Sequence, residues 1–548
     1  MINKIKLILL AALIFPVLLS CEDEFLERTP TDAISADDAL ASVDNMQLVL
    51  NGVHRGLYSQ SQTIFPGGNT ARANNHYWVP MGDNLAGYLI HSANANNLGW
   101  RTNAQWNDHT VPTSLTNELL WYHRYNIILH ANLLINGIAE SGFTETAQLN
   151  EILGQAYTYR AYAYLSLVQH YAKGYLIGNP ETDPGVPLLF SSDSPFTSEP
   201  RSSVQDIYDQ IGSDLTDAIT AFENGTGRTG SGADAKSQLN IDVAYGIRAR
   251  WALSKGDWET AAASAVAARQ DYPIMNEADW LSGFNSNELS EVIWGSNVIE
   301  AETTFFRSYF YLASNTFNGS QIRNNPKIAD RRLVDAIPET DYRGKVFIVD
   351  APNTNTSAAN GEGGFGNDPN YTDEAAFNAR RAEINAEYGI TNSFNQHPYM
   401  HFKLKNASPG TIDPDDVIYM RSSEMYLIEA EALAMMDDVP NAQIALETLV
   451  NERDSAFDVS AFNTRESLME EIKFQRRLEL WGEGFGYTDK IRWDEGIDHA
   501  ADGGSGASQV LYQQAYQIER PSINDDWIFL IPQAEINANP NLTSGDQN

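Results

Sequence analysis

The segment 59–112 carries aromatic rings beside amide, carboxylate and guanidinium groups, which is the mixture that a sugar-binding site needs. Sugars present C–H faces that stack on flat rings, and hydroxyls that need planar polar partners. A peptide-binding site would instead need backbone partners and apolar pockets, and the sequence leaves that alternative open. The candidate ligand-binding residues of this segment are Tyr77, Trp78, Asp83, Asn84, Tyr88, Trp100, Arg101 and Trp106.

Catalytic signatures are missing from the sequence. Glycoside hydrolysis needs two carboxylates across a cleft, but among 72 acidic residues such a pair can always be found. The chain has no G-x-S-x-G elbow, H-E-x-x-H pair, G-x-x-x-x-G-K-[ST] loop or G-x-G-x-x-G turn. We therefore predict no catalytic residue, and a surface glycoside hydrolase is the distant alternative.

Metal-ligating patterns are equally weak. His397 and His401 have the spacing of ligands on a helix, but Pro398 between them makes a regular helix doubtful. The segments 366–374 and 413–416 offer oxygen ligands for calcium, although neither has EF-hand spacing. We predict no metal site and no cofactor, with bound calcium as the alternative.

The charge of the chain excludes one class of partner. With 36 basic and 72 acidic residues, the net charge of −36 repels nucleic acid and anionic lipid. We therefore predict no nucleic-acid partner.

The only cysteine, Cys21, lies where an apolar run ends. Two lysines precede the apolar stretch 7–19, which is typical of a secretory signal and short for a membrane span. The letters "LLSC" resemble the lipobox of bacterial lipoproteins, in which the cysteine is acylated and becomes the new N-terminus. We predict a lipoprotein signal peptide at 1–20 and lipidation of Cys21; an ordinary signal peptide with an incidental cysteine is the alternative.

The remaining chain, 21–548, is predicted to be one domain built mainly from helices. Apolar residues recur at helical spacing in 115–142, 151–175 and 203–225. The segments 239–273 and 418–454 each predict two helices joined by a short acidic turn, with small residues on the second helix. In the first of them Asp257 is placed to cap its second helix, and the pairs should stack into a superhelix.

Two long segments, 59–112 and 284–405, show no helical periodicity and are predicted to be irregular loops. Loops of this length in a compact protein are usually functional. A short strand is expected at 346–350, so the fold should contain a little β-structure.

A series of motifs, in order along the chain, resembles the SusD/RagB family. They are "LLSCEDEFLERTP", "LWYHRYNIILHANLLINGI", "EILGQAYTYRAYAYLSLVQHYA", "GVPLL", "SVQDIYDQIGSDLTDAI", "YMRSSEMYLIEAEALA", "RRLELWGEGFGYTDKIRW" and "IPQAEINANPNLTSGDQN". No single motif is decisive, but together they cover nearly the whole chain. The acidic residues after Cys21 also resemble the signal that sends lipoproteins of the Bacteroidetes to the outer face of the outer membrane.

The resemblance implies a function as well as a fold. Members are mainly α surface lipoproteins with stacked tetratricopeptide-like helix pairs and minor β-structure. They bind glycans, or in some branches peptides, and cover a TonB-dependent SusC-like outer-membrane barrel that imports the ligand. This implies an oligosaccharide ligand, a barrel partner and attachment to the outer membrane through the lipid anchor.

The resemblance also suggests which residues bind the ligand, because family sites are built largely from long loops. The matching regions here are 59–112 and the segment that begins at Thr303. Trp78, Trp100 and Trp106 are the predicted stacking platforms, Tyr309 and Phe317 are predicted to approach from the second segment, and Asp83, Asn84 and Arg101 are predicted hydrogen-bonding partners. The tryptophans predicted to be core residues are Trp121, Trp251, Trp481 and Trp493.

The chain departs from the family pattern at two positions. Gly486 stands where the family often has an arginine, and Gln475 where it often has an acidic residue. Both lie in motifs interpreted as scaffold, so the changes put a local ion pair in doubt. The carboxylates of Glu424, Glu429 and Glu431 are predicted to pair with arginines of neighbouring helices.

Overall fold

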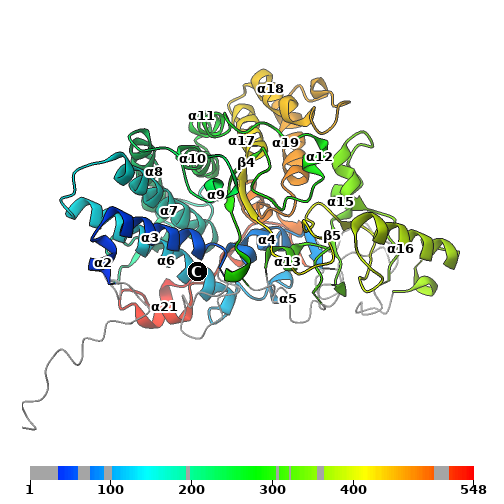
Figure 1. The fold of residues 1–548 in the computed structure, drawn as a ribbon, viewed down its shortest axis with the longest axis horizontal. Coiled ribbons are helices and arrows are strands. Elements are labelled where there is room, and N and C mark those ends of the chain that lie inside the picture. Colours follow the sequence, from blue (N-terminus) through cyan, green and yellow to red (C-terminus); the bar gives the residue numbers. More distant parts are fainter. Residues whose placement is uncertain are drawn as a thin grey trace, which may run out of the picture.

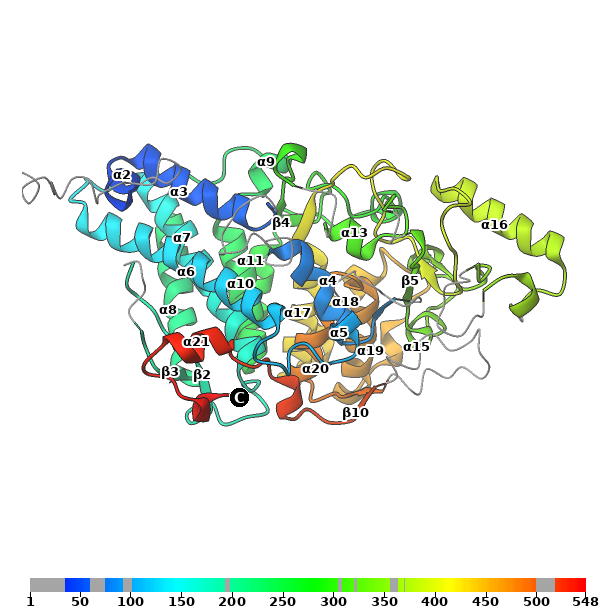
Figure 2. The same ribbon diagram turned by 90° about the horizontal axis from the view of Figure 1, so that it is seen from below.

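The computed structural model describes residues 35–59, 74–91, 101–192, 198–303, 308–319, 323–354, 363–368, 370–498 and 518–548. The fold is mainly helical, as predicted, and elongated, with α2 and α3 near one end and α16 at the other (Figures 1 and 2). Cys21 and the predicted signal peptide lie outside the described residues. Within the described part, no helix is both long and apolar enough to cross a membrane.

The three helices predicted in the first half are present, and each begins at a side-chain cap. They are α6 (Leu115–Glu140), α7 (Ala147–Tyr171) and α8 (Val204–Glu223). Thr146 accepts a hydrogen bond from the backbone N–H of Leu149 at the start of α7, and α8 begins with a capping box from Ser203. Before them lie α2 (Ala36–Leu40) and α3 (Val43–Gly56).

The predicted helix pairs are also confirmed. The first is α10 (Ile241–Lys255) with α11 (Trp258–Ala268), and the second is α17 (Ser422–Met435) with α18 (Val439–Val450). Gly256 ends α10 in the left-handed region at φ 79°, and Asp257 caps α11 by accepting from the N–H of Thr260, as predicted. Ala261, Ala265 and Ala268 of α11 are fully buried, so the neighbouring helices approach closely.

These helices pack one against the next through the molecule. The order of contact is α6, α7, α8, α10, α11, α17 and then α18 and α19 (Arg465–Glu479). Figure 1 shows this succession from the blue and cyan helices to the orange α19. Such an array resembles a tetratricopeptide superhelix. The segments between its helices pack against it.

The strands are short. One four-stranded antiparallel sheet has the order β1 (Leu89–His91), β5 (Lys327–Ala329), β7 (Met400–His401), β6 (Phe347–Ile348). Its strand β6 confirms the strand predicted at 346–350. The two-stranded pairs are β2 (Pro184–Pro187) with β3 (Arg201–Ser203), β4 (Val292–Ser296) with β8 (Val417–Arg421), and β9 (Ile497–Asp498) with β10 (Glu519–Arg520).

The prediction that 59–112 and 284–405 are irregular throughout is wrong. The first contains α4 (Asn75–Leu85) and α5 (Arg101–Ala104), and the second contains α13 (Tyr309–Ala313), α15 (Arg331–Val334) and α16 (Glu374–Tyr388). Helix α4 is buried on nearly every side, so its sequence has no alternation of apolar and polar faces at helical spacing. Helix α16 is polar on nearly all sides and buries few side chains, so its sequence shows little apolar periodicity. The short helices α9 (Ala233–Lys236), α12 (Glu277–Trp280), α20 (Gly486–Arg492) and α21 (Gln533–Ala538) complete the chain.

A buried charge network ties the C-terminal half together, and we call it the Glu479 network. Glu479, at the end of α19, contacts the guanidinium groups of Arg343, Arg421 and Arg453. Although burial alone would raise the pKa of Glu479, these three cations hold it well below its usual range. The network holds four basic and four acidic side chains: Arg343, Lys403, Arg421, Arg453, Glu291, Asp341, Glu479 and Glu483.

The predicted scaffold carboxylates do pair with arginines. Salt bridges join Glu424 to Arg250 of α10, Glu429 to Arg269 next to α11, and Glu431 to Arg492 of α20. Near the Glu479 network, the Oε1 atom of Gln475 accepts from Arg343, so a neutral amide contacts this arginine where the chain departs from the family pattern.

The predicted core tryptophans are confirmed at Trp121, Trp251 and Trp481, which are all buried. Trp493 is only partly buried, and the prediction is wrong there. Its ring lies instead beneath the guanidinium groups of Arg477 and Arg492, on the outer side of α20.

Candidate functional site

Helix α4 lies next to the two cavities of interest, one lined by its own side chains and the other by Ala86, just after its end. It packs against α13, α20 and β1. Asp83 accepts from the backbone N–H groups of Gly484 (2.9 Å) and Gly486 (2.8 Å), which fastens α4 to the turn before α20. Gly82 permits this contact, because a Cβ there would lie 2.2 Å from the Gly484 carbonyl oxygen.

Asp83 is therefore a structural carboxylate. Burial raises its pKa to about 6, against the opposing effect of the two N–H donors. Its neighbour Asn84 is also buried and donates to the carbonyl of Leu89. Both side chains were predicted to bind ligand, and the structure shows both engaged with the backbone.

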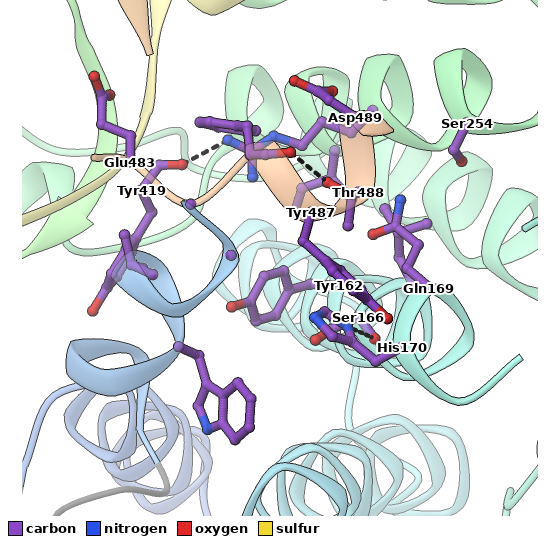
Figure 3. Close-up of a pocket in the computed structure, with 18 of the residues that line it drawn as sticks. Tyr162, Ser166, Gln169, His170, Ser254, Tyr419, Glu483, Tyr487, Thr488 and Asp489 are labelled. Carbon is purple, nitrogen blue, oxygen red and sulfur yellow. Dashed lines mark hydrogen bonds between the residues drawn. The ribbon is translucent and has the colours of Figure 1, made fainter. Parts of the chain in front are cut away.

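Helix α4 lines a cavity of about 170 Å³, which we call the chamber. Trp78 and Gly82 of α4 form one wall of it. The facing wall is a polar stripe on α7, where Tyr162, Ser166 and His170 follow one another at helical spacing (Figure 3). The remaining wall comes from α6, α10, β4, β8, α19 and α20.

The stripe on α7 is held by hydrogen bonds. The Nδ1–H of His170 donates to the Ser166 carbonyl, and the Arg124 guanidinium donates to the Ser166 hydroxyl. Burial lowers the pKa of His170 to about 4, so its ring is neutral and its Nε2 atom is an acceptor. The His170 ring also stacks on Tyr487 of α20 at 5.5 Å between centroids.

Beyond the C-terminal end of α4, next to Ala86, lies a second cavity of about 450 Å³, which we call the Tyr88 cavity. Tyr88 contributes a ring from the turn between α4 and β1, and Phe474 contributes a second from α19. Charged groups lie between the rings, with Arg477 paired to Glu495 and Arg332 paired to Asp330. Aromatic faces beside paired carboxylates and guanidinium groups are the chemistry with which proteins hold sugar hydroxyls and C–H faces.

Lys490 closes the base of the Tyr88 cavity. Its Nζ atom lies 5.4 Å from the centroid of the Tyr88 ring and donates to the Gly496 carbonyl. Burial lowers the pKa of Lys490 to about 8. This amine is therefore only partly charged above neutral pH, which makes the charge of the cavity sensitive to mild alkali.

The structure does not gather the predicted site residues into one surface. Trp106, Tyr309 and Phe317 are core residues, with exposed fractions of 2%, 3% and 0%. The Trp106 indole donates to the Leu85 carbonyl, and the Tyr309 hydroxyl donates to the Gly482 carbonyl. The prediction that these rings are exposed is wrong, because the segments that carry them fold into the core. Tyr77 is likewise buried.

Two predicted residues do line a cavity, Trp78 at the chamber and Tyr88 at the Tyr88 cavity. Trp100 lies outside the described residues; Arg101 begins α5, and its side chain is outside the description. Contact of any predicted residue with a ligand stays a prediction.

Sequence reasoning missed Phe474, Arg477 and Lys490, because their motif was interpreted as scaffold. The spacing of Phe474 and Arg477 on one face of α19 could have indicated a shared surface.

The predicted calcium ligands have protein partners. Asp416 accepts from the N–H groups of Asn287 and Val298, and Asp373 caps α16. Within the described ranges, no group of three or more His, Cys, Asp or Glu side chains could hold a metal ion. No helix joins His397 and His401, as expected from Pro398 between them. His401 lies in β7, and its Nε2–H donates to the Ala313 carbonyl. The absence of a cofactor stays a prediction, with bound calcium as its alternative.

Stacked helix pairs that carry cavities lined by rings and polar groups define a helical-repeat binding protein. Residues 37–247 match a family described as starch-binding and associating with the outer membrane, and residues 281–548 match the SusD family. The chain belongs to the SusD/RagB family.

Similar proteins support this placement. SusD-like protein P38 of Formosa agariphila is 26% identical over 414 residues, which is 72% of this chain and 75% of that protein. A SusD-like carbohydrate binding protein from Bacteroides vulgatus shares the fold with a TM-score of 0.69 at 22% identity, over 92% of this chain and 98% of that one. A SusD superfamily protein from Bacteroides thetaiotaomicron matches with a TM-score of 0.68 at 21% identity, over 92% and 99%.

Proposed function

We propose that this protein is a cell-surface lipoprotein that binds oligosaccharide and delivers it to a TonB-dependent outer-membrane transporter. The observation that carries the proposal is the family match on both halves of the chain, one half to a family described as starch-binding. The Tyr88 cavity supports it, because it combines aromatic faces with charged hydrogen-bonding groups in an open cavity of about 450 Å³.

A direct binding experiment tests the glycan ligand against the peptide alternative. The protein lacking residues 1–20 is titrated with a panel of oligosaccharides and with a peptide mixture in a calorimeter. We expect heat from at least one glycan and none from the peptides. Binding of peptides alone would replace the glycan by the alternative ligand.

Substitution at the cavity tests where the glycan binds. Tyr88→Ala removes a ring from the Tyr88 cavity and should weaken glycan binding at least tenfold. Tyr245→Ala removes a tyrosine of similar burial from α10, outside the cavity, and should leave the affinity unchanged. Equal affinities of the two variants would place the glycan elsewhere on the protein.

The anchor and the transporter are tested on cells. Cys21→Ser should abolish labelling by a radioactive fatty acid and release the folded protein from the membrane. Mild solubilisation of the unaltered protein should recover a large β-barrel with it. Label retained by the variant would contradict the anchor, and recovery of the protein alone under inducing growth would contradict the transporter complex.

The hydrolase alternative is tested by prolonged incubation with polysaccharides that bind. We expect no new reducing ends. Turnover that disappears on substitution of a carboxylate, while binding remains, would make the protein an enzyme.

A further inference from the structure

Lys490 of α20 lies at the base of the Tyr88 cavity, between residues that line it. Its Nζ atom donates to the Gly496 carbonyl at 2.9 Å and lies 5.4 Å from the centroid of the Tyr88 ring, and both of these residues belong to the wall. An ammonium group has three N–H donors. Among the described residues, the Gly496 carbonyl is the one acceptor of Lys490, so two donors remain for a ligand at this wall.

The carboxylate of Glu495 acts on the charge of Lys490 but is engaged by other cations. Its Oε1 atom binds the Lys473 ammonium at 2.8 Å, and its Oε2 atom binds the Arg477 guanidinium. Both oxygens of the carboxylate are therefore taken. Within the described ranges, Lys490 makes no salt bridge of its own.

The wall of the Tyr88 cavity is positive at its base and negative at its rim. Two of its three carboxylates are paired with arginines of the same wall, Glu495 with Arg477 and Asp330 with Arg332. The third, Asp498, is exposed, so water and salt screen its charge. Lys490 is only 9% exposed, so its charge is screened far less. A cation without a carboxylate partner therefore lies at the base, in a chain of net charge −36.

The pKa of Lys490 reflects the missing partner. Burial is the largest cause that lowers this pKa, to about 8, and the positive charge of Arg477 adds to the effect. At pH 7 the amine is still mostly protonated, so the base holds a cation whose loss of hydration no carboxylate offsets. An anion bound beside the ammonium would offset it.

The cavity has room and apolar faces for a sugar beside this cation. Its volume of about 450 Å³ lies within the range of about 300–1,000 Å³ that small-molecule sites occupy. The rings of Tyr88 and Phe474 line it, and the C–H faces of sugars stack on such rings. The Arg332 side chain is 47% exposed, and Asp498 and Pro521 are exposed as well, so the cavity opens to solvent along these residues.

We propose that the Tyr88 cavity binds an acidic unit of an oligosaccharide, whose carboxylate or sulfate ester contacts the Lys490 ammonium and whose ring lies against Tyr88. This inference rests on the proposed glycan binding and names the class of glycan. An ammonium group is a compact charge that binds either kind of anion, so both kinds of acidic sugar enter the test.

Pairs of oligosaccharides that differ only in charge test the proposal. Oligosaccharides from polygalacturonate and alginate are compared with their carboxyl-reduced forms, and those from κ-carrageenan with their desulfated form, by calorimetry at pH 7. At least one acidic member should bind at least tenfold more tightly than its neutral form. Equal affinities within every pair, or binding of neutral glycans such as maltotriose alone, would overturn this inference and leave the glycan proposal standing. Absence of binding by every glycan would contradict both.

Substitutions assign the anion to Lys490. Lys490→Gln removes the charge and keeps a hydrogen-bonding side chain, so it should weaken binding of the acidic oligosaccharide at least tenfold and leave binding of the neutral form unchanged. Lys236→Gln is the matched control, because Lys236 is 7% exposed and also donates to a backbone carbonyl, that of Leu289, outside the cavity wall. Tyr88→Ala should weaken binding of both forms alike, which separates loss of the ring from loss of the charge.

Thermal unfolding checks that these variants fold. If Lys490→Gln folds and keeps its affinity for the acidic oligosaccharide, the anion does not bind at Lys490. If Tyr88→Ala also keeps that affinity, the acidic glycan binds outside the Tyr88 cavity. Either result would overturn the proposal.

The unaltered protein gives a test that needs no variant. As the pH rises from 7 to 9, through the pKa of about 8, the Lys490 ammonium loses its proton. The affinity for the acidic oligosaccharide should then fall by up to about tenfold, and that for the neutral form should stay constant. An affinity for the acidic form that is equal at both pH values would contradict a contact with Lys490.

The groups around Lys490 do not imitate this pH dependence. Although burial alone would raise the pKa of Glu495, Arg477 and Lys473 lower it, so Glu495 stays charged. Burial raises the pKa of Tyr88, so its phenol stays neutral. The charged residues that act on Lys490 are Asp330, Arg332, Arg477 and Glu495.

Discussion

The Glu479 network and the chamber are both buried and both rich in arginine, yet they differ in how their charges are matched. In the network, four cations face four carboxylates, and the pKa of Glu479 is held low by three guanidinium groups despite burial. In the chamber wall, Arg124 lacks an anion among the described residues, and donors on Trp78, Trp294 and Arg476 are free. The difference teaches that the same residue types can form a fully matched network that serves the fold, or a cavity wall in which one cation has no carboxylate partner.

The largest expected effect comes from breaking the network at its centre. Glu479→Gln removes the charge that three buried arginines share, and we expect a loss of about 3–5 kcal/mol in the free energy of unfolding. Denaturant unfolding measures it. Glu277→Gln is the control, because its pair with Lys345 is exposed and should change stability by less than about 1 kcal/mol. A loss below 1 kcal/mol for Glu479→Gln would mean that the network is not structural.

Asp83 offers the opposite electrostatic case, a buried carboxylate held by N–H groups and not by a cation. Because its pKa is raised to about 6, the folded state holds a proton that the unfolded state releases from about pH 4 upward. Its contribution to stability therefore falls as the pH rises from 4 to 6, by roughly 3 kcal/mol at about 1.4 kcal/mol per pKa unit.

Asp83→Asn should remove this pH dependence. Unfolding of both proteins across pH 4–7 measures it, and the unaltered protein should lose stability relative to the variant as the pH rises. A constant difference between the two would show that Asp83 titrates normally.

Gln475 tests whether the network is already balanced. Gln475→Glu restores the acidic residue of the family pattern, but it adds a fifth carboxylate beside Arg343. It also removes the N–H that Gln475 donates to Glu471. We expect a loss of about 1–3 kcal/mol at neutral pH and a smaller loss near pH 4. A gain in stability would show that Arg343 has spare charge.

The smallest expected effect compares two serines that each accept from a buried arginine. Ser423 accepts from Arg421 inside the network, and Ser166 accepts from Arg124 at the chamber. Ser423→Ala should cost about 1–2 kcal/mol, since nothing replaces the hydroxyl in a filled interior. Ser166→Ala should cost less than about 1 kcal/mol, since water that enters the chamber can replace the hydroxyl. A reversed order, measured by thermal unfolding, would contradict the distinction between the two regions.

The sequence predicted the parts of the fold that have a clear period. Helices α6, α7 and α8, the pairs joined at Asp257 and at 437–438, and the carboxylates of Glu424, Glu429 and Glu431 all follow from spacing and residue type. Helix α4 was missed because burial on all sides erases amphipathic periodicity, and α16 was missed because exposure on nearly all sides does the same.

The candidate site was harder to predict, because a ring's identity does not tell which side it faces. Trp106, Tyr309 and Phe317 are residue types that can stack on sugars, but the structure buries all three in the core. The polar stripe of Tyr162, Ser166 and His170 was visible at helical spacing in α7. Its meaning depended on α4 and α20, which lie far away in the sequence and supply the other walls.

The close approach of Gly82 and Gly484 has a consequence for cutting the chain. By sequence, α4 belongs to the stretch that matches at 37–247, but by packing it belongs with α13 and α20 of the later stretch. A Cβ at Gly484 would lie 2.0 Å from the Val79 carbonyl oxygen, so this contact leaves no room for a side chain at residue 484. A fragment that ends near residue 230, in the loop after α8, would leave the apolar surface of α4 bare and should aggregate. Co-expressed with a fragment that begins near residue 231, it should recover solubility by complementation, with glycine at both positions required for the two pieces to rejoin.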